Sequence, residues 1–413
     1  MKERKIQMNW ADYVSSNGLC SGCGLCESFC GNDKISVEIN KDGFYRPKLI
    51  NHLTQEEVTN LNVLCPGGHI VHDSFGLKNN YHPIWGPVME SHFGSAADPE
   101  TRFLGSSGGG ISALAVFLLE SHKVDYILHS GASLLNPLSI VDKVSRTKEE
   151  VLSAAGSRYL PSAPLKRIEY YLSQEKTFAF IGKPCDIAAL NNLSKIDPRV
   201  DEKILLKISF MCAGVPSING SIELIRQAGF SEEKIKSIKY RGQGWPGDWI
   251  VIGENGKKKS MNYETSWGFL SHFVQFRCKI CPDGAGEFAD ITFGDGWYLE
   301  NNMPVFADRD GRNLMITRTG RGKHLLQDCC VAGYLSIAPL DINKLNDMQP
   351  YQAMRKKLVK SRLLALKFMG KKTPIYENLG LKEAARQAGL WANLRSFIGT
   401  LIRVCFHTSY ETP

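Results

Sequence analysis

The chain has 413 residues, of which 43% are hydrophobic and 22% are charged. This composition is typical of a folded globular protein and excludes a largely disordered chain, and the length suffices for about two or three domains with buried cores. The net charge of +8 is compatible with an anionic cofactor, an acidic protein partner or a membrane surface. Binding to nucleic acid is not expected, because no helix-turn-helix, RNP-type or finger motif accompanies the charge.

The sequence shows no sign of export or membrane insertion. Residues 1–7 are charged, no apolar segment follows them, and no run of about 18 or more apolar residues occurs. We therefore expect a cytoplasmic protein in which the 12 cysteines remain reduced and are available to bind metal.

Closely spaced cysteines are the first pattern along the chain. They are Cys20, Cys23, Cys26 and Cys30. Two residues separate each of the first three thiols and three residues precede the fourth, as in bacterial ferredoxin-type iron–sulfur proteins. Gly22 and Gly24 favour a tight loop, because glycine lets the backbone pass close to an inorganic core. The remote pair Cys65–Pro66 is typical of the ligand that closes such a site, so we predict one 4Fe–4S cluster on the first three thiols and Cys65. Cys30 is then a spare thiol.

A disulfide framework and a zinc site fit these cysteines less well. Disulfide frameworks are typical of small secreted domains, and zinc sites usually show two separated cysteine pairs rather than three evenly spaced thiols. After the run, residues 35–39 alternate as a strand does, 40–43 suit a turn and 44–47 begin a second strand, which predicts a hairpin. We expect residues 1–75 to form a small ferredoxin-like 4Fe–4S module that depends on its metal for stability.

A loop rich in glycine and serine precedes an apolar helix predicted over residues 111–120. Its candidate ligand-binding residues are Ser106, Ser107, Gly108, Gly109 and Gly110. The N–H groups at the start of such a helix favour an anion, so the loop could cradle the pyrophosphate of a dinucleotide. It lacks the lysine of a P-loop and the spacing of a Rossmann fingerprint. A serine cap and a flexible turn before a core helix are the alternative interpretation.

Strands and helices alternate through the middle of the chain. The predicted segments are strands at 124–129, 177–181 and 204–211 and helices at 149–152 and 187–190. This order indicates an α/β layer that binds ligands at the carboxyl ends of its strands. Cys185 and Cys212 lie at two such ends. Arg158 is a candidate phosphate or flavin contact, with a surface salt bridge as the alternative.

A second cysteine pair, Cys278 and Cys281, is followed by Pro282. Together with Cys185 and Cys212 it gives four thiols at loop positions, which could hold a second 4Fe–4S cluster. A zinc site is one alternative, and a lone reactive Cys185 beside a structural Cys-x2-Cys pair is another. The remaining thiols are predicted to be small apolar core residues: Cys329, Cys330 and Cys405.

Residues 346–413 differ in character from the rest of the chain. The segment 354–362 carries five Lys or Arg residues, and a helical apolar stripe follows at 390–405 with Arg395 and Arg403 on its opposite side. Such a helix could contact an anionic membrane surface. Packing against its own domain is the more common arrangement, and we expect it here.

Several of these motifs occur together in one known family. Besides the cysteine run and Cys65–Pro66, they are Ser-Ser-Gly-Gly-Gly (106–110), Gly-Ser-Arg-Tyr (156–159), Gly-Lys-Pro-Cys-Asp (182–186), Arg-Cys-Lys-Ile-Cys-Pro-Asp (277–283) and Ala-Asp-Ile-Thr-Phe-Gly-Asp (289–295). From about residue 15 to about residue 320 the sequence resembles the coenzyme F420 hydrogenase/dehydrogenase β-subunit family. Bacterial members of that family often look like partners of surface-polysaccharide synthesis genes, so the resemblance implies a role of that kind for this chain. This chain departs from the pattern in having one cluster in its ferredoxin part and in its basic tail after residue 345.

The resemblance implies iron–sulfur clusters, FAD, and electron transfer between the clusters and a hydride carrier. It implies FAD contacts from the loop 106–110 and Arg158, and it places Gly182, Lys183 and Pro184 near the flavin. It also implies that a second cluster is bound by Cys185, Cys212, Cys278 and Cys281. The fold class expected is α+β and α/β: a ferredoxin-like iron–sulfur module over 1–75, a flavin-binding α/β domain over 76–345, and a basic helical region over 346–413.

We therefore expect a flavin- and iron–sulfur-dependent oxidoreductase, because FAD exchanges both hydride and single electrons. Lys183 or Arg158 could place positive charge near the flavin. No Ser-His-Asp arrangement or HExxH motif supports hydrolysis. The alternatives are an electron-transfer subunit without its own substrate site, which would dock a ferredoxin or a larger enzyme, and a zinc-stapled interaction protein. The substrate is left open between a deazaflavin, a nicotinamide and a sugar-linked intermediate.

Overall fold

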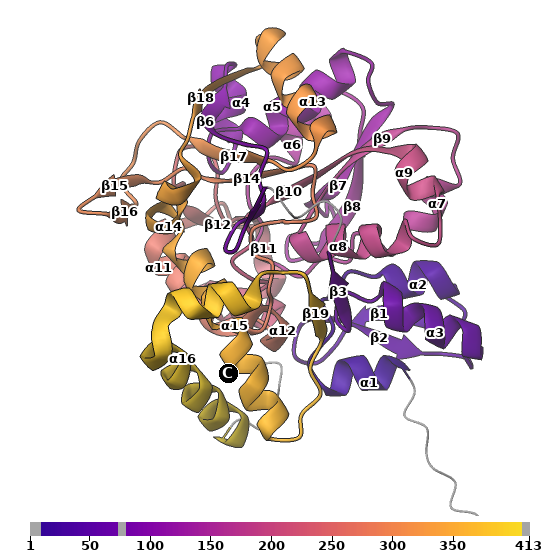
Figure 1. Cartoon of the computed structure of the whole chain (residues 1–413). Coiled ribbons are helices and arrows are strands. Elements are labelled where there is room, and N and C mark those ends of the chain that lie inside the picture. The colour runs from indigo at the N-terminus through magenta and orange to yellow at the C-terminus, as the bar shows by residue number, and fades with distance from the viewer. Residues whose placement is uncertain (1–9, 73–79, 407–413) are drawn as a thin grey trace, which may run out of the picture.

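An eight-stranded mixed sheet forms the centre of the computed structural model, which describes residues 10–72 and 80–406 (Figure 1). Its strands lie in the order β18-β6-β17-β14-β10-β9-β7-β8. They are β6 (Glu90–Ala96), β7 (Tyr126–Ala132), β8 (Ile140–Ser145), β9 (Phe178–Gly182), β10 (Ile204–Phe210), β14 (Ile291–Asp295), β17 (Asn313–Thr317) and β18 (Leu335–Pro339). The charged residues 1–7 and the predicted domain boundary between residues 75 and 76 lie outside the described residues.

The middle of this sheet is parallel. β7 pairs with β9, β9 with β10 and β10 with β14, all in parallel register, while the outer strands pair antiparallel. Successive side chains of a strand point to opposite faces, so Phe178 and Phe180 belong to one core and Ala179 to the other. The predicted α/β layer is confirmed, and the parallel strands bring their carboxyl ends to one edge of the sheet.

Helices cover both faces of the sheet. α5 (Gly110–Glu120) and α13 (Gly320–Val331) share a core with one face, and α8 (Pro184–Leu193) packs on the other with α2 (Leu25–Cys30) and α3 (Gln55–Leu64). α5 follows the predicted apolar segment and is buried along most of its length. Its apolar sequence therefore matches its position inside the fold.

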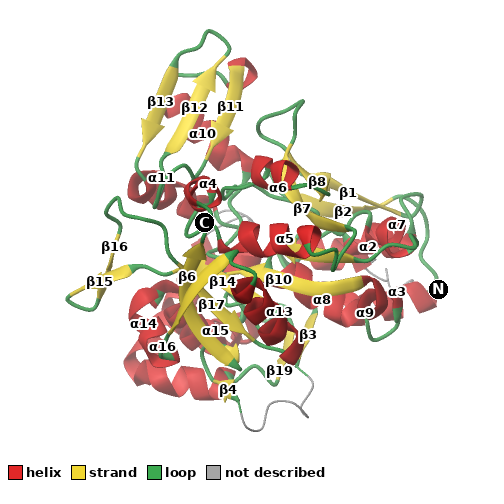
Figure 2. Ribbon diagram, turned by 90° about the horizontal axis from the view of Figure 1, so that it is seen from above, coloured by secondary structure: helices red, strands yellow, loops and turns green. Residues whose placement is uncertain are grey.

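Smaller elements surround the sheet. The remaining helices are α1 (Trp10–Ser16), α4 (Pro99–Leu104), α6 (Lys148–Ser153), α7 (Ile168–Leu172), α9 (Arg199–Lys203), α10 (Ile218–Gln227), α11 (Tyr263–Leu270), α12 (Phe276–Lys279), α14 (Leu345–Met348), α15 (Pro350–Phe368) and α16 (Leu381–Phe406). The small sheets pair β1 (Ile35–Ile39) with β2 (Tyr45–Leu49), β3 (His69–Val71) with β19 (Ile375–Glu377), β4 (Tyr81–His82) with β5 (Gly86–Pro87), and β15 (Tyr298–Glu300) with β16 (Met303–Val305). Figure 2 shows the three-stranded sheet of β11 (Ile235–Lys239), β12 (Trp249–Gly253) and β13 (Lys258–Met261) at the periphery.

The N-terminal module contains the predicted hairpin. β1 and β2 pair antiparallel, and the turn is fixed by a hydrogen bond from the Phe44 N–H to Asn40 Oδ1 (3.0 Å). Thr54 and Glu57 form a capping box at the start of α3. The module shares its core with Leu366 of α15, and β3 pairs in parallel with β19. The N-terminal module and the C-terminal region are therefore packed together.

The C-terminal helices differ from the sequence-based prediction in two respects. Cys329 is buried as predicted, but Cys405 is exposed on α16, so the prediction that it is a core residue was wrong. Only part of the apolar stripe packs inward, because Leu394 and Ile398 face solvent. The reason is that α16 packs through one face, and its other apolar positions are not covered by the residues that the structure describes. Among the described helices none combines the length and the apolar character that crossing a bilayer requires.

Candidate functional site

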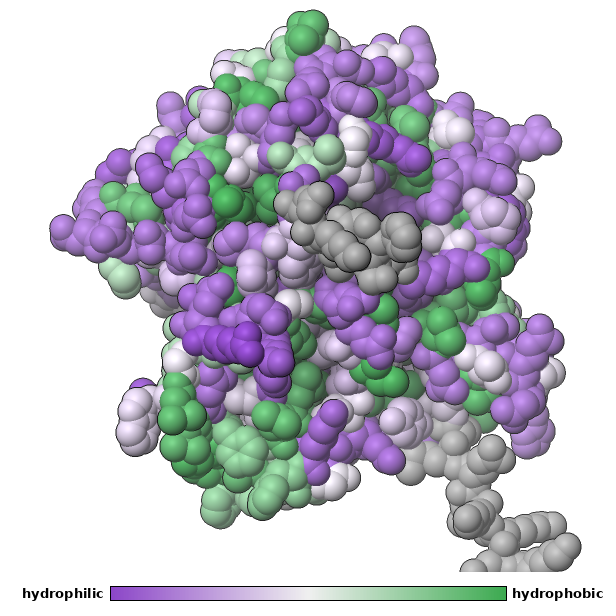
Figure 3. Space-filling model, in the orientation of Figure 1, coloured by the Kyte–Doolittle hydropathy of each residue, from purple (hydrophilic) through white to green (hydrophobic). Residues whose placement is uncertain are grey.

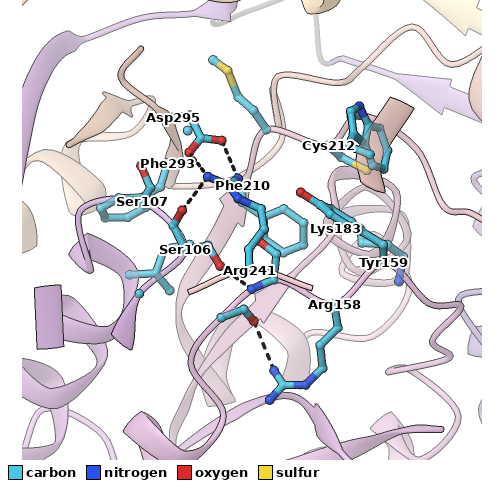
Figure 4. A pocket seen from close by; sticks show the side chains of 18 of the residues that line it. Ser106, Ser107, Arg158, Tyr159, Lys183, Phe210, Cys212, Arg241, Phe293 and Asp295 are labelled. Atoms are coloured by element: carbon cyan, nitrogen blue, oxygen red, sulfur yellow. Dashed lines mark hydrogen bonds and ion pairs between the residues drawn. The ribbon is translucent and has the colours of Figure 1, made fainter. Parts of the chain in front are cut away.

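A cavity of about 600 Å³ opens at the carboxyl ends of the parallel strands (Figure 4). Gly182 ends β9, Phe210 ends β10 and Asp295 ends β14, and all three line it. Cavities at this edge of an open α/β sheet are the usual ligand sites, because loops diverge there and leave backbone groups exposed. The sequence-based prediction of the site's position therefore agrees with the geometry.

The glycine- and serine-rich loop forms one wall of the cavity. Ser106, Ser107, Gly109 and Gly110 line it, whereas Gly108 does not. Gly109 has a φ of 70°, and the Gly110 N–H donates to Asn313 Oδ1 (2.8 Å). The Ser107 hydroxyl donates to a backbone carbonyl (2.8 Å). These contacts fix the conformation of the loop. The Gly110 N–H and the Ser107 hydroxyl are therefore already hydrogen-bonded within the protein.

Arg158 and Lys183 bring positive charge to the cavity. The Arg158 guanidinium donates to the carbonyls of Ala154 (2.8 Å) and Gly156 (3.2 Å), and burial lowers its pKa. Among the described residues it forms no ion pair, so the surface-salt-bridge alternative does not describe its surroundings. Lys183 is buried and its Nζ lies 2.8 Å from Asp186 Oδ2.

Lys183 keeps its charge in this environment. Burial lowers its pKa, but the Asp186 carboxylate and the Cys185 thiol raise it, and the net direction is upward. Its ammonium also donates to Ser162 Oγ (2.7 Å). Lys183 and Gly182 line the cavity, whereas Pro184, the first residue of α8, does not. The predicted Gly-Lys-Pro segment thus contributes two of its three residues.

An arginine that the sequence analysis did not single out lies at the centre of the cavity wall. Arg241 pairs with Asp295 through two hydrogen bonds, of 2.9 and 2.8 Å, and donates to the carbonyl of Ser106 (2.6 Å). Its guanidinium stacks on the rings of Tyr263 (4.7 Å) and Trp297 (5.5 Å). The signal in the sequence was a glycine-rich segment, 241–247, which precedes β12 and matches no common ligand-binding spacing.

The four thiols predicted for the N-terminal cluster lie together. We call Cys20, Cys23, Cys26 and Cys65 the N-terminal cysteine group. Burial raises the pKa of Cys26, and the charges of the other three raise it further. The Gly22 N–H points at Cys20 Sγ (3.3 Å), and a Cβ on Gly67 would lie 3.2 Å from Cys65 Sγ and 2.5 Å from a backbone oxygen. Close backbone and N–H···S contacts of this kind are those expected around an iron–sulfur cluster.

The four thiols of the predicted second cluster also converge, although they come from separate segments. We call Cys185, Cys212, Cys278 and Cys281 the second cysteine group. Cys185 lies in the first turn of α8, Cys212 follows β10, and the other two are on and after α12. Burial raises the pKa of Cys212 to about 12, with the charge of Cys278 as the next cause. Cys212 also lines the cavity, so this group borders the ligand site.

Cations surround the second cysteine group. Arg355 on α15 is buried and donates to the carbonyl of Cys212 (2.7 Å), and the charges of three of these thiols raise its pKa against burial. Arg277 is buried beside the group and donates to the carbonyl of Pro66 (2.7 Å). That bond joins the loop of the second group to the residue after Cys65, so the two cysteine groups are linked through one side chain.

The described residues contain no compact site for a single metal ion. Within residues 10–72 and 80–406, no three Cys, His, Asp or Glu side chains converge closely enough to hold a single metal ion.

Comparison with known proteins places the chain in a family. Two family models match it: the N-terminal model of the coenzyme F420 hydrogenase/dehydrogenase β subunit over residues 92–169 and the C-terminal model over residues 175–343. The chain belongs to the coenzyme F420 hydrogenase/dehydrogenase β-subunit family. The family resemblance predicted from the motifs is thereby confirmed. The matched segments include the cavity loop, Arg241 and the second cysteine group, but not the N-terminal group or α15 and α16.

Relatives agree with this assignment, and a solved structure shares the fold. The chain is 26% identical to the β subunit of coenzyme F420 hydrogenase from Methanococcus voltae, over 66% of this chain and 94% of the relative. It is 23% identical to coenzyme F420-dependent sulfite reductase from Methanocaldococcus jannaschii, over 76% of this chain but only 46% of the relative. A chain of the F420-reducing [NiFe] hydrogenase complex from Methanosarcina barkeri shares the fold, with a TM-score of 0.54 and 19% identity over 71% of this chain and 98% of that one. The family's proteins are oxidoreductases and their subunits, which confirms the predicted general class.

Proposed function

We propose that this chain is an iron–sulfur flavoprotein subunit that passes electrons between 4Fe–4S clusters and FAD and exchanges hydride with a deazaflavin of the coenzyme F420 type. The observation that carries the proposal is the position of Cys212, which belongs to the second cysteine group and also lines the cavity. A group bound in the cavity would therefore lie beside a cluster bound by these thiols. The names of several relatives contain coenzyme F420, which favours a deazaflavin over a nicotinamide.

The lining of the cavity suits FAD. Arg158 offers a guanidinium without a carboxylate partner among the described residues, and the loop 106–110 offers backbone next to it. Aromatic side chains that line the cavity provide surfaces for flat rings; they are Tyr159, Tyr263, Trp267, Trp297 and Phe306. FAD, when bound, supplies the exchange between hydride and single electrons. Lys183 would hold fixed positive charge near it.

The two cysteine groups suit 4Fe–4S clusters. Their thiols are free of disulfides, and burial together with mutual repulsion raises the pKa of most of them, so the apo protein would hold them protonated. Cluster assembly would then release protons and contribute to folding stability. A cluster, when bound, supplies a one-electron carrier. Around the second group, Arg355 and Arg277 would balance the negative charge, which raises a cluster's potential.

The partner that the comparisons favour is a larger enzyme. Several relatives are named as β subunits of a hydrogenase or a formate dehydrogenase, and the structural match comes from a hydrogenase complex. We propose that this chain likewise receives electrons from, or delivers them to, other subunits. Exchange with a ferredoxin and the role in surface-polysaccharide synthesis stay predictions.

Anaerobic purification of the full chain tests the proposal. We expect iron and acid-labile sulfide equivalent to two clusters, one extractable flavin, and loss of the absorbance of reduced F420 when it is mixed with the protein. Arg158→Gln should lower flavin content severalfold and leave iron unchanged, because this residue lines only the cavity. Arg167→Gln, on an exposed arginine elsewhere, is the matched control. A chain that holds iron but neither flavin nor hydride activity would contradict the proposal.

A further inference from the structure

The outer face of α16 is apolar and exposed. After a break in the helix at Gly389 (φ 77°), the large exposed apolar side chains are Leu390, Trp391, Leu394, Ile398, Ile402 and Phe406. Trp391 is 81% exposed and Phe406 is 79% exposed. Steps of about four residues place most of these side chains on one side of a helix. We call them the α16 stripe; Figure 3 shows hydrophobic residues gathered over α16 at the lower left of the molecule.

The opposite face holds α16 in place. The ring of Phe397 meets that of Phe368 on α15 with centroids 6.1 Å apart, and the Arg362 Nε donates to Ser396 Oγ (3.4 Å). Thr400 is buried and Val404 packs on the core of the N-terminal module. The helix is thus fixed by an inner face of its own, and the stripe is a second apolar face that the described residues leave uncovered.

Positive charge accompanies this surface. Residues 350–406 contain twelve Lys or Arg residues and two acidic residues, Glu377 and Glu383, so this segment alone exceeds the net charge of +8 of the whole chain. Arg355 and Lys356 are buried and serve other contacts. The remaining ten give the helical hairpin a strongly cationic character, which attracts anionic surfaces.

Three of the cations in this region crowd together. The Arg362 guanidinium donates to the carbonyl of Lys279 (2.5 Å), and Arg403 of α16 lies close enough to act on both. Among the described residues none of the three forms an ion pair with a carboxylate. Like charges gathered in this way favour an anion that comes from outside the chain.

We propose that α15 and α16 rest on an anionic lipid surface, with the α16 stripe at the boundary between headgroups and acyl chains and a lipid phosphate between Lys279, Arg362 and Arg403. From Leu390 to Phe406 the helix is about 25 Å long, and apolar residues with tryptophan on one side and basic residues beside them are typical of helices that lie in a membrane interface. A second copy of the chain is a poorer occupant, because two such cationic surfaces repel each other. A protein subunit with an acidic and apolar surface would also match this face. The vesicle experiment below separates it from a membrane, because such a subunit gives no flotation with lipid.

Flotation of the full chain with lipid vesicles tests this proposal independently of flavin or cluster content. We expect the protein to float with vesicles of phosphatidylcholine mixed with phosphatidylglycerol, and to stay behind with phosphatidylcholine alone. The paired substitution Trp391→Ser and Ile398→Ser should reduce partitioning about a hundredfold or more, since it removes two inserted large side chains. Arg403→Gln should reduce it about fivefold, the effect expected for one cation near a charged membrane.

Matched controls distinguish lipid binding by α16 from nonspecific hydrophobic adsorption and from misfolding. Leu134→Ser with Leu135→Ser removes two fully exposed apolar residues of another loop and should leave partitioning unchanged, as should Lys257→Gln. Circular dichroism and iron content should be the same for all variants. Three outcomes would each overturn the proposal. They are equal binding to both kinds of vesicle, undiminished binding of the stripe variant, and a concentration-dependent dimer that the stripe variant abolishes without changing flotation.

Discussion

The N-terminal cysteine group and the second cysteine group are assembled in different ways. The N-terminal group takes three of its four thiols from residues 20–26, and α3 brings the fourth. The second group takes its thiols from α8, from the end of β10 and from the segment around α12, which the central sheet and α15 hold together. Neighbouring residues within the N-terminal module therefore position most of the thiols of the first group. The thiols of the second group are positioned by elements from several parts of the fold.

This difference has a physical basis. Closing a short loop around a metal costs little chain entropy, and the cluster itself supplies much of the folding energy of such a module. Bringing distant segments together costs more, and the core on both faces of the sheet must offset that cost. The second group is also the one that borders the cavity and lies among buried cations. We infer that a defect there affects both the cluster and the ligand site, whereas a defect in the first group remains local.

The largest effects should come from removing one thiol of each group. Cys278→Ser should lose one cluster's worth of iron, about four atoms, and also most of the flavin, because loosened segments around it line the cavity. Cys23→Ser should lose a similar amount of iron and keep the flavin. Iron, sulfide and flavin counts on anaerobically purified variants measure both, with Cys405→Ser at an exposed position as the control. Full retention of iron in Cys23→Ser would refute the N-terminal ligand assignment.

The next effect concerns the ion pairs that lie near the two cysteine groups, Glu287 with Lys356 and Glu57 with Lys34. Glu287, buried after the second group's loop, pairs with Lys356 and accepts a hydrogen bond from the Tyr81 hydroxyl (2.8 Å). Glu287→Gln leaves Lys356 buried without its partner, so the free energy of unfolding should fall by about 3 kcal/mol, with loss of second-cluster iron. Urea unfolding under anaerobic conditions measures the change. Glu57→Gln, in the more exposed pair with Lys34 near the N-terminal group, should change little.

The effect of Glu287→Gln should depend on pH. Burial raises the pKa of Glu287, but Lys356 and His72 outweigh it and hold the pKa at about 2, below the ordinary 4.5. A carboxylate with a lowered pKa stabilises the fold fully above its unfolded value and loses that contribution as the pH falls through its folded value. The difference between wild type and variant should therefore be complete above about pH 4.5 and narrow toward pH 2. A difference that stays constant over this range would show that the charge is not responsible.

The smallest of these effects tests the tight loop of the N-terminal group. Gly24 has a φ of 88°, and a Cβ there would lie 2.5 Å from Lys166 Cγ and 2.9 Å from the Lys166 backbone nitrogen. Gly256 has a similar φ of 78° with open space around it. Gly256→Ala should cost about 1 kcal/mol for the left-handed backbone alone, and Gly24→Ala about 1–2 kcal/mol more. Thermal unfolding together with iron counts compares the two variants. An equal loss of unfolding free energy in both would mean that close packing does not constrain the loop.

Much of the fold followed from local pattern. The hairpin at 35–49, the helix after the glycine-rich loop, and the strands that became β9 and β10 were all predicted, because alternation and apolar runs reflect which face of an element is buried. The cysteine spacing predicted a local cluster loop, since such a loop is specified by neighbouring residues. The family followed from the same motifs.

Only the tertiary structure decided how distant residues meet. The pairing of Arg241 with Asp295 joins two segments that the sequence gives no reason to connect. Arg355 reaches the second cysteine group from a helix of the basic C-terminal region, to which the sequence assigned no role at that site. The exposure of Cys405 and of the α16 stripe could not be predicted from the sequence either. The reason is that periodicity reports that a helix has an apolar face, whereas the number of neighbours available to cover such faces is set by the packing of the whole chain.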